Sequence, residues 1–316
     1  MAVLEVRDLE VSFGSTRILR GVSFDLIEGQ TLGVVGESGC GKSMTGFAVM
    51  GMLHSPGRIS GGSIKLNGRE LVGLPERELQ QVRGAQIALV MQDPFTSLNP
   101  MMCVGDQVAE ALILHQRLSK AEAWKRAIEM LDEVGVSAPE QSARKYPHQM
   151  SGGQRQRVVI AMAFACRPKV LIADEPTTAL DVTLQAQILR LLRDLQEKEG
   201  TAVMLISHDI GAIASVSERI AVFYAGQIVE TGTAEQVLRH PAMPYTKSLL
   251  NALPRAGVTK LEAIGGQPPD FATLATGCPF APRCAYRQDK CAEAPPLATI
   301  GEGHLSACWF SSKVAS

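Results

Sequence analysis

Apolar and polar residues alternate in the first segment of the chain, from Leu4 to Leu26, and the alternation is interrupted once at Gly14-Ser15. A period of two is typical of strands that face a core on one side and solvent on the other. A Gly-Ser pair commonly marks a turn between two such strands. This segment therefore predicts two antiparallel strands.

Apolar runs without alternation follow at residues 31–35, 87–90, 170–173 and 203–206. Strands of a parallel sheet are covered on both faces and need no polar side. Helical stretches separate these runs, and the clearest is Thr183–Glu199, whose apolar residues repeat with a period of 3.6 and stop before Gly200. Strands that alternate with helices predict an α/β core.

The segment Gln92–Met150 has a different, mostly helical pattern. Ser119 and Glu122 form a capping-box pattern ahead of an apolar stripe that ends at Gly135. We interpret residues 93–165, approximately, as a helical subdomain inserted into the α/β core.

The last part of the chain is rich in proline. Seven of the 17 prolines lie between Pro254 and the C-terminus. Proline interrupts helices and is excluded from central strands. We therefore predict a main domain of residues 1–253, followed by a loop-rich extension of residues 254–316.

The charge of the chain is nearly balanced, with 31 Lys and Arg against 32 Asp and Glu. Proteins that bind nucleic acid usually carry a basic surplus, so we expect no nucleic-acid partner. The longest clean apolar run, Val158–Cys166, is far shorter than the roughly 18–20 residues of a membrane-spanning helix. The first residues lack the pattern of a secretory signal, which favours a cytosolic location.

The segment Gly36–Ser43 reads Gly-Glu-Ser-Gly-Cys-Gly-Lys-Ser and fits the phosphate-loop pattern between an apolar strand and a helical stretch. Its glycines let backbone N–H groups and a helix N-terminus face the phosphates, while Lys42 supplies a positive charge and Ser43 a hydroxyl for Mg²⁺. This pattern predicts an ATP site. The residues expected to contact ATP here are Gly36, Ser38, Gly39, Cys40, Gly41, Lys42, Ser43 and Met44.

Cys40 lies inside this loop, close to the expected helix N-terminus. That environment lowers the pKa of a thiol and makes it reactive. We therefore expect reagents to alkylate Cys40, and we expect bound ATP to block this reaction. The alternative is that cysteine is simply small enough for this position.

The apolar run at residues 170–173 ends in two acids, Asp174 and Glu175. The carboxyl edge of a parallel sheet is where a phosphate loop also lies. Asp174 can then hold Mg²⁺, directly or through water, and Glu175 can orient or deprotonate the attacking water. Two acids at a strand end are also common as a solvated terminus, and the phosphate loop upstream favours the catalytic interpretation.

A second glycine-containing turn, Ser151-Gly152-Gly153-Gln154, opens the apolar stretch Val158–Ala165. Ser151 is a natural N-cap, and the glycines allow close backbone approach. The turn is a second possible anion site, although taken in isolation it is interpreted by default as an ordinary capped helix start.

In order and spacing these motifs resemble the ATP-binding cassette family over residues 1–235. The resemblance implies a RecA-like P-loop ATPase core with an N-terminal antiparallel β subdomain. It also implies that Phe13 stacks on adenine, that Gln92 senses Mg²⁺ and couples to a membrane subunit, and that His208 contacts the γ-phosphate.

Members of this family work as pairs of cassettes that close head to tail on ATP. The resemblance implies that the Ser151 turn of one cassette caps the ATP held by the other, and that Asp181, in the motif Ala179-Leu180-Asp181, links the two sites. The residues expected to act across the dimer are Ser151, Gly152, Gly153, Gln154 and Asp181.

Two further stretches, Val90–Pro100 and His240–Thr246, closely resemble the ATP-binding subunits of dipeptide, oligopeptide and nickel importers. The resemblance implies peptide uptake with a sister ATP-binding subunit, two transmembrane permease subunits and an extracytoplasmic substrate-binding protein. It places the chain peripherally on the cytoplasmic side of the plasma (inner) membrane, with Phe95–Met101 as the permease contact.

The cargo stays open, because the permease and the binding protein select it, and nickel, glutathione or an oligosaccharide are alternatives. A soluble cassette protein that acts on DNA or ribosomes would need a coiled coil, fused tandem cassettes or basic arms, and the sequence has none of these.

Four of the seven cysteines lie close to the C-terminus, at Cys278, Cys284, Cys291 and Cys308. Four thiolates suit either tetrahedral Zn²⁺ or a [4Fe–4S] cluster, and the spacing does not choose between them. The stretch resembles the C-terminal extension of the importer subunits, which favours a [4Fe–4S] cluster as a structural staple. Zn²⁺ and plain reduced cysteines remain alternatives. His304 is a possible alternative ligand, but we favour the interpretation that it is a solvated loop histidine.

Overall fold

The computed structural model describes residues 1–178, 180–253, 264–274 and 276–315, so Ala179 and Pro254 lie outside the described residues. The chain divides into two compact units. The first unit consists of Met1–Val3, Leu26–Gln30 and Gly73–Leu205. The second unit consists of Leu4–Asp25, Thr31–Val72 and Ile206–Ser316.

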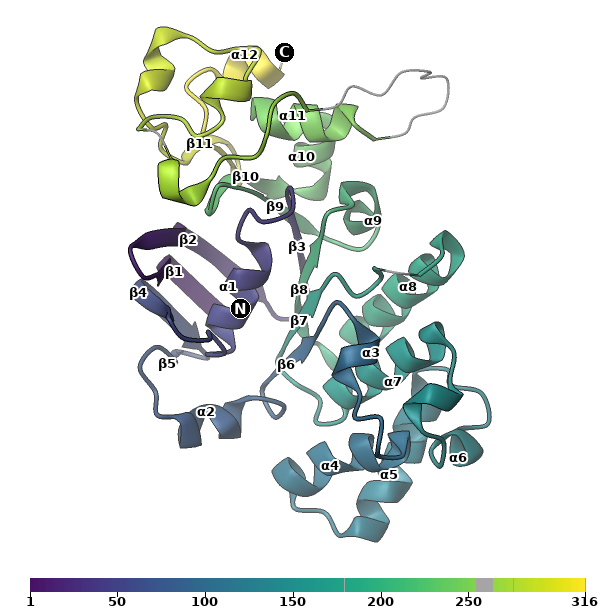
Figure 1. The fold of residues 1–316 in the computed structure, drawn as a ribbon. Coiled ribbons are helices and arrows are strands. Elements are labelled where there is room, and N and C mark those ends of the chain that lie inside the picture. Colours follow the sequence, from purple (N-terminus) through teal and green to yellow (C-terminus); the bar gives the residue numbers. More distant parts are fainter. Residues whose placement is uncertain (179, 254–263, 275, 316) are drawn as a thin grey trace. The chain divides into compact units, whose positions relative to one another are not determined.

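An antiparallel sheet supplies one layer of the second unit (Figure 1). The alternating segment forms neighbouring strands β1 and β2, and β1 pairs antiparallel with β4. Alternate residues of β1, among them Leu4 and Val6, are fully buried, as a period of two requires. The sheet order is β2-β1-β4-β5, with β1 at Ala2–Phe13, β2 at Thr16–Ile27, β4 at Gly57–Leu66 and β5 at Arg69–Glu70.

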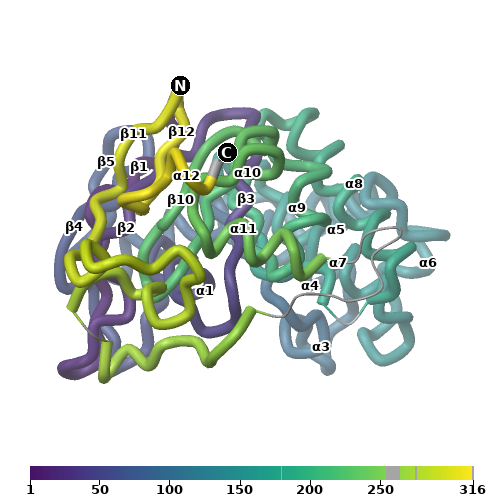
Figure 2. The backbone as a smooth tube through the Cα atoms, turned by 90° about the horizontal axis from the view of Figure 1, so that it is seen from above, coloured from purple at the N-terminus to yellow at the C-terminus, as the bar shows by residue number. Residues whose placement is uncertain are grey.

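The second unit also contains the strand that leads into the phosphate loop. This strand, β3 (Thr31–Val35), pairs in parallel with β9 (Arg219–Tyr224), and β10 (Gln227–Thr233) lies antiparallel on the far side of β9. The hairpin of β11 (Ala298–Gly301) and β12 (His304–Ser306) continues this sheet beyond β10 (Figure 2). The proline-free end of the extension therefore supplies an internal strand, β12, where the sequence predicted no central strand.

Helices of the second unit are short. Four of them are α-helices that flank the strands or follow them, and the extension adds 3₁₀ turns and one last helix. They are α1 (Lys42–Val49), α9 (Ile210–Ala214), α10 (Ala234–Arg239), α11 (Pro244–Asn251), η2 (Phe271–Thr273), η3 (Ala281–Arg283), η4 (Asp289–Ala292) and α12 (Ser311–Ala315).

The first unit contains the other predicted parallel strands. Strand β6 (Ile87–Val90) pairs in parallel with β7 (Val170–Asp174), and β8 (Ala202–Ser207) begins in this unit on the other side of β7. Every residue of β7 and β8 is buried. Burial on both faces explains the absence of alternation in these runs and confirms the parallel arrangement predicted from it.

The helices of the first unit gather mainly between β6 and β7 in the chain (Figure 1). The predicted capping box forms, because the Ser119 side chain accepts from the Glu122 backbone while Glu122 reaches back to Ser119. The predicted crossover helix ends at Gly200, which takes a left-handed conformation. The helices are α2 (Glu76–Val82), α3 (Pro94–Ser97), α4 (Val104–Gln116), α5 (Lys120–Glu133), α6 (Pro139–Ser142), η1 (Pro147–Gln149), α7 (Gly152–Phe164) and α8 (Val182–Glu199).

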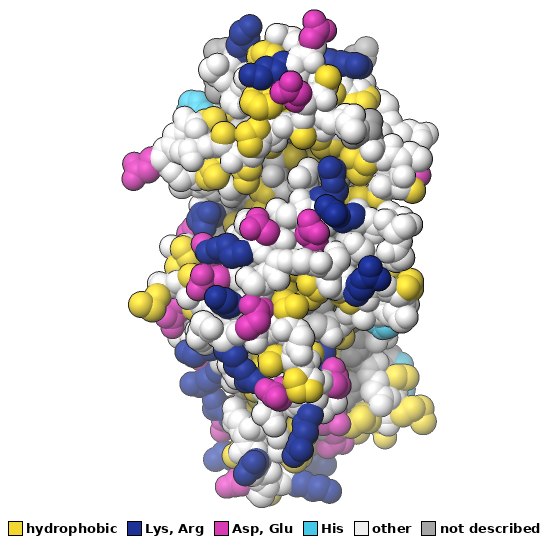
Figure 3. Space-filling view, turned by 90° about the vertical axis from the view of Figure 1, so that its left-hand side faces the viewer, with side chains coloured by type: hydrophobic (Ala, Val, Ile, Leu, Met, Phe, Trp, Pro, Cys, Tyr) yellow, Lys and Arg dark blue, Asp and Glu magenta, His cyan; other side chains and the backbone are white. Residues whose placement is uncertain are grey.

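The surface mixes charges of both signs. Figure 3 shows one face on which Lys and Arg side chains are interspersed with Asp and Glu side chains. No helix among the described residues combines the length and the hydropathy that crossing a bilayer requires.

The turn between β9 and β10 joins the phosphate loop to the antiparallel sheet. Gly226 donates its N–H to the Cys40 carbonyl and accepts from the Arg20 N–H. Its φ is +75°, and a Cβ there would lie 1.9 Å from the Ile18 carbonyl oxygen. Only glycine fits this close approach of three segments.

We expect Gly226→Ala to lower the free energy of unfolding by about 3 kcal/mol or more, because left-handed strain and a backbone clash add. Gly14→Ala is the matched control, since Gly14 also has a positive φ but no atom within 4 Å of its Cβ position. That control should lose only about 1–2 kcal/mol. Urea denaturation monitored by circular dichroism measures both, and equal losses would contradict the close approach.

Candidate nucleotide-binding site

The phosphate loop lies between the end of β3 at Val35 and the start of α1 at Lys42. Gly39 and Gly41 have φ values of 77° and 109°, which other residues avoid. A Cβ on Gly36 would lie 2.3 Å from the Phe223 carbonyl oxygen. The loop therefore needs its glycines for curvature and for close packing, as the motif predicted.

The start of α1 is suited to an anion. Its N-cap is Gly41, and no side chain among the described residues caps this helix end. The first-turn N–H groups therefore rely on other partners, and a helix N-terminus carries a partial positive charge. Ser43 and Met44 follow in the first turn and are half-buried, while Ser38 and Gly39 are exposed at the tip of the loop.

The ammonium of Lys42 is held inside the loop. Its side chain is buried, and Nζ donates to the carbonyls of Gly36 at 2.8 Å and Glu37 at 2.9 Å. The Cys40 sulfur lies 3.7 Å from the same nitrogen. This arrangement places a positive charge at the centre of a glycine-lined cradle, which fits a phosphate group.

The other predicted residues of the second unit lie at strand ends. Phe13 is the last residue of β1, stands opposite Gly57 of β4 and packs its ring close over that glycine. It is half-buried, so part of the aromatic ring is open to solvent. His208 is exposed and directly follows β8, and the next residue, Asp209, caps α9.

The two predicted catalytic residues of the first unit lie together. Gln92 follows β6 and donates from Nε2 to Glu175 Oε2 at 3.0 Å. Thr178 donates to the same oxygen at 2.9 Å. Two donors on one carboxylate oxygen fix the Glu175 side chain directly after β7, whose last residue, Asp174, is buried.

The backbone of Glu175 is strained. Its φ is +46°, a conformation that few residues other than glycine adopt. Such strain persists only where the surrounding structure enforces it, and it is concentrated at functional sites. The strained turn and the two donors together hold the Glu175 carboxylate in one position.

The Ser151 turn forms the predicted N-cap of α7. Ser151 Oγ accepts from the Gln154 N–H, and the Gln154 side chain accepts from the Ser151 N–H. Gly153 packs against Leu184 of α8, where a Cβ would lie 2.6 Å from a leucine methyl. Asp181 is exposed and caps α8 through the Leu184 N–H. The capping is confirmed, and Ser151 itself is exposed.

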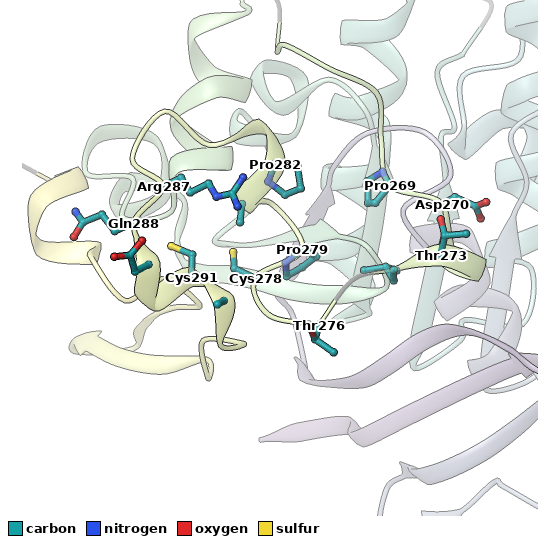
Figure 4. A pocket seen from close by; sticks show the side chains of 14 residues that line it. Pro269, Asp270, Thr273, Thr276, Cys278, Pro279, Pro282, Arg287, Gln288 and Cys291 are labelled. Carbon is teal, nitrogen blue, oxygen red and sulfur yellow. The ribbon is translucent and has the colours of Figure 1, made fainter.

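The four cysteines of the extension share one small pocket. Cys278 and Cys291 also line a larger pocket of about 800 Å³ beside it, which Figure 4 shows with both sulfur atoms. Burial, with the neighbouring thiols adding to it, raises the pKa of Cys284 to about 11. The residues of the small pocket include Cys278, Cys284, Cys291 and Cys308.

These thiols do not form a ligand shell. Among the described residues, no three or more His, Cys, Asp or Glu side chains are grouped so that they can hold a metal ion. His304 is turned elsewhere, because its Nε2 lies 2.8 Å from Glu230 Oε1, and both residues are buried. The expectation of a solvated histidine was therefore wrong, since His304 lies in β12 and pairs with an acid of β10.

Comparison with known proteins identifies the family. A family model described as ABC transporter matches residues 19–178, and one described as oligopeptide/dipeptide transporter, C-terminal region, matches residues 229–291. The chain is 50% identical over 313 residues to the oligopeptide transport ATP-binding protein OppD of Salmonella typhimurium, covering 97% of this chain and 93% of that protein. The chain belongs to the ABC transporter family.

Other relatives agree with this assignment. The dipeptide transport ATP-binding protein DppD of Bacillus subtilis is 46% identical over 321 residues, 99% of this chain and 96% of that protein. A dimeric ATP-binding cassette, MJ0796, in a post-hydrolysis state with ADP and phosphate, matches with a TM-score of 0.65 and 29% identity over 73% of this chain and 98% of the cassette. This ABC chain is therefore an ATP-binding ATPase with the cassette fold.

Sequence reasoning missed several residues that hold the loop of this ABC cassette. The hydroxyl of Tyr245 accepts from the Glu37 N–H at 2.8 Å, and burial raises the pKa of that hydroxyl. Tyr245 lies in the stretch His240–Thr246, whose only signal in the sequence is its resemblance to importer subunits. Arg283, from the extension, also reaches Glu37. No local pattern marks such contacts between distant segments.

The prediction of an activated Cys40 thiol was wrong. Its side chain is buried, and burial raises its pKa more strongly than Lys42 and the neighbouring hydrogen bonds lower it. Desolvation penalises the thiolate, which is the reactive form. The position of Cys40 inside the loop agrees with the alternative interpretation, that the residue is a small side chain filling a tight space.

We expect N-ethylmaleimide to modify Cys40 more slowly than the thiol of glutathione near neutral pH, with a rate that climbs about tenfold per pH unit as the thiolate forms. Bound MgATP should slow it further. Peptide mass spectrometry follows Cys40 separately and uses the half-exposed Cys103 as an internal reference for reagent access. A fast modification whose rate already stops rising below neutral pH would show that the Cys40 thiol is activated after all.

Proposed function

We propose that this ABC chain hydrolyses ATP to drive uptake of di- or oligopeptides through separate permease subunits. The observation that carries the proposal is the hydrogen bond between Gln92 and Glu175. It joins a residue just ahead of the exposed side chains of Phe95 and Met101 to the carboxylate that we propose for catalysis. The OppD and DppD relatives described above are named for oligopeptide and dipeptide transport, and the chain aligns with nearly their whole length.

In the proposed mechanism, the phosphate loop and Lys42 bind the ATP phosphates, and Phe13 stacks on the adenine. Ser43, Gln92 and Asp174 would hold Mg²⁺, and the bound cation would supply positive charge to neutralise the phosphates. The hydroxyl of Ser43, the amide oxygen of Gln92 and the carboxylate of Asp174 are oxygen ligands of the kind that Mg²⁺ prefers. Glu175 orients and deprotonates the attacking water, and His208 contacts the γ-phosphate.

A sister ATP-binding subunit completes each site in this proposal. The Ser151 turn presents the capped N-terminus of α7 at the surface, with Ser151 exposed. Asp181 is exposed too, and its neighbour Val182 has an apolar side chain that is 82% exposed. An exposed apolar residue beside two helix N-termini supports contact with a second cassette, in which Ser151, Gly152, Gly153, Gln154 and Asp181 act on the partner's ATP.

The permease contact is proposed at Phe95–Met101. Phe95 and Met101 are 63% and 83% exposed, and Met91 nearby is also exposed. The Arg155 guanidinium stands 4.2 Å from the centroid of the Phe95 ring, within cation–π distance. We propose two transmembrane permease subunits, an extracytoplasmic binding protein and a peripheral location on the cytoplasmic side of the membrane. Nickel, glutathione and oligosaccharide remain alternative cargoes.

For the extension we propose a [4Fe–4S] cluster held by the four cysteines, with Zn²⁺ as the alternative. The support is that all four thiols line one small pocket and come from separate turns of a proline-rich segment. A centre bound there would tie these turns together. Closing the shell requires side-chain movement, because the described thiols are not yet grouped for a metal.

We expect Glu175→Gln to lower kcat for ATP hydrolysis by about 10²-fold or more, because the amide cannot accept the proton of the attacking water. ATP affinity should be retained, since the change keeps the size and the bonds to Gln92. The control is Glu197→Gln, an exposed acid of α8 paired with Arg193. Steady-state hydrolysis and nucleotide titration measure the two quantities, and unimpaired turnover would remove Glu175 from the mechanism.

Cys284→Ser should remove iron and acid-labile sulfide, and with them the brown colour, from protein purified without oxygen. Cys166→Ser is the control, because Cys166 lies in the first unit, outside the cluster. Iron and sulfide analysis with metal mass spectrometry measures the outcome. Stoichiometric zinc in the parent protein would select the alternative, and protein free of both metals would refute a metal centre.

A further inference from the structure

A buried arginine of the extension, Arg283, forms an ion pair with the phosphate loop. Arg283, the last residue of η3, donates from its two terminal nitrogens to the two carboxylate oxygens of Glu37, at 2.6 and 2.8 Å. Only 5% of the Arg283 side chain is exposed. A bidentate pair out of water is stronger and more strictly oriented than a surface ion pair.

Arg283 is itself fixed from several sides. Its Nε donates to the Gly265 carbonyl at 2.8 Å, and a terminal nitrogen donates to the Tyr224 hydroxyl at 3.2 Å. Tyr224, Tyr245 and Phe280 form an aromatic cluster with ring centroids 4.6 to 5.4 Å apart. The guanidinium therefore has little freedom to leave Glu37.

Glu37 connects this anchor to the nucleotide-binding lysine. Its N–H donates to Tyr245, and its carbonyl accepts from Lys42 Nζ at 2.9 Å and from the Cys40 N–H at 3.3 Å. The side chain of Glu37 thus faces the extension while its backbone sets the position of Lys42. A second contact runs beside it, since Pro268, Pro269 and Phe271 line a small pocket with the loop residues Glu37–Cys40.

The charge of Arg283 matters as well as its position. Glu37 puts a carboxylate in a loop whose ligand carries several negative charges, and an unpaired carboxylate there would repel phosphate. Arg283 neutralises it with both oxygens engaged. The pair therefore removes a repulsion and fixes the loop at the same time.

We propose that Arg283 is a positioning residue for the nucleotide: through Glu37 it holds and neutralises the phosphate loop, so the C-terminal extension sets the affinity for ATP. The proposal rests on the proposed role of the phosphate loop in ATP binding. It assigns to the extension a part in the ATP cycle of the same chain.

The test is a set of full-length variants titrated with a fluorescent ATP analogue and Mg²⁺. Arg283→Gln should raise Kd about tenfold, because it frees the carboxylate. Glu37→Gln should raise Kd less than Arg283→Gln does, because it breaks the pair without leaving a free carboxylate near the phosphates, and the double variant should recover part of the lost affinity. Hydrolysis should show a raised KM with kcat little changed. Arg287→Gln, an exposed arginine of the same loop region, is the matched control.

Recovery in the double variant separates this role from a merely structural one. If Arg283 only tethers the extension, removing Glu37 as well cannot restore affinity, and a double variant as weak as Arg283→Gln would overturn the proposal. Unchanged Kd in Arg283→Gln would overturn it too. If that variant does not fold, Arg283→Lys keeps the charge without the fork, and a Kd equal to the parent's would refute the geometric part.

Lys42→Ala distinguishes the two levels of inference. Loss of nucleotide binding in Lys42→Ala together with normal binding in Arg283→Gln removes only the role of Arg283. Intact binding in Lys42→Ala would instead refute the phosphate loop as the nucleotide site. Thermal unfolding followed by circular dichroism, run on every variant, shows whether a change in Kd arises with the fold intact.

Discussion

The second unit depends on keeping one ammonium group, that of Lys42, buried in a loop of backbone carbonyls. A buried charge is tolerated only with close, well-oriented partners, and the carbonyls of Gly36 and Glu37 supply them. Gly36, whose carbonyl binds Lys42, packs against the Phe223 backbone without room for a side chain. Tyr245 supports the loop from outside, because its hydroxyl accepts from the Glu37 N–H.

The sequence predicted local structure correctly wherever a motif determines the backbone conformation of a few neighbouring residues. The glycines of the phosphate loop, the Ser151 cap and the Ser119 capping box have effects that extend over only a few residues, so their spacing carries the information. Buried parallel strands were readable for a similar reason, since burial on both faces removes polar positions. The position of Asp174 and Glu175 at the end of a buried strand was readable too, whereas the hydrogen bond between Gln92 and Glu175 came only from the structure.

The remainder could not be read, because it depends on contacts across long separations. Arg283 and Glu37 are 246 positions apart, and neither lies in a pattern that points to the other. The pKa of Cys40 depends on how completely its neighbours exclude water, which position next to a helix does not reveal. Likewise, His304 resembled a loop residue until β12 joined the sheet and paired it with Glu230. Composition correctly described a proline-rich segment but not the short strand within it.

The hairpin of β11 and β12 gives the extension a protective task as well. It covers β10, whose N–H and C=O groups would otherwise form the rim of the sheet, and the Ala307 N–H closes on the Val229 carbonyl. A chain cut short before the hairpin would present a bare edge of unpaired backbone N–H and C=O groups that can recruit strands from other molecules. Shortened chains would then self-associate through the uncovered edge of the sheet, whether or not they still bind and hydrolyse ATP.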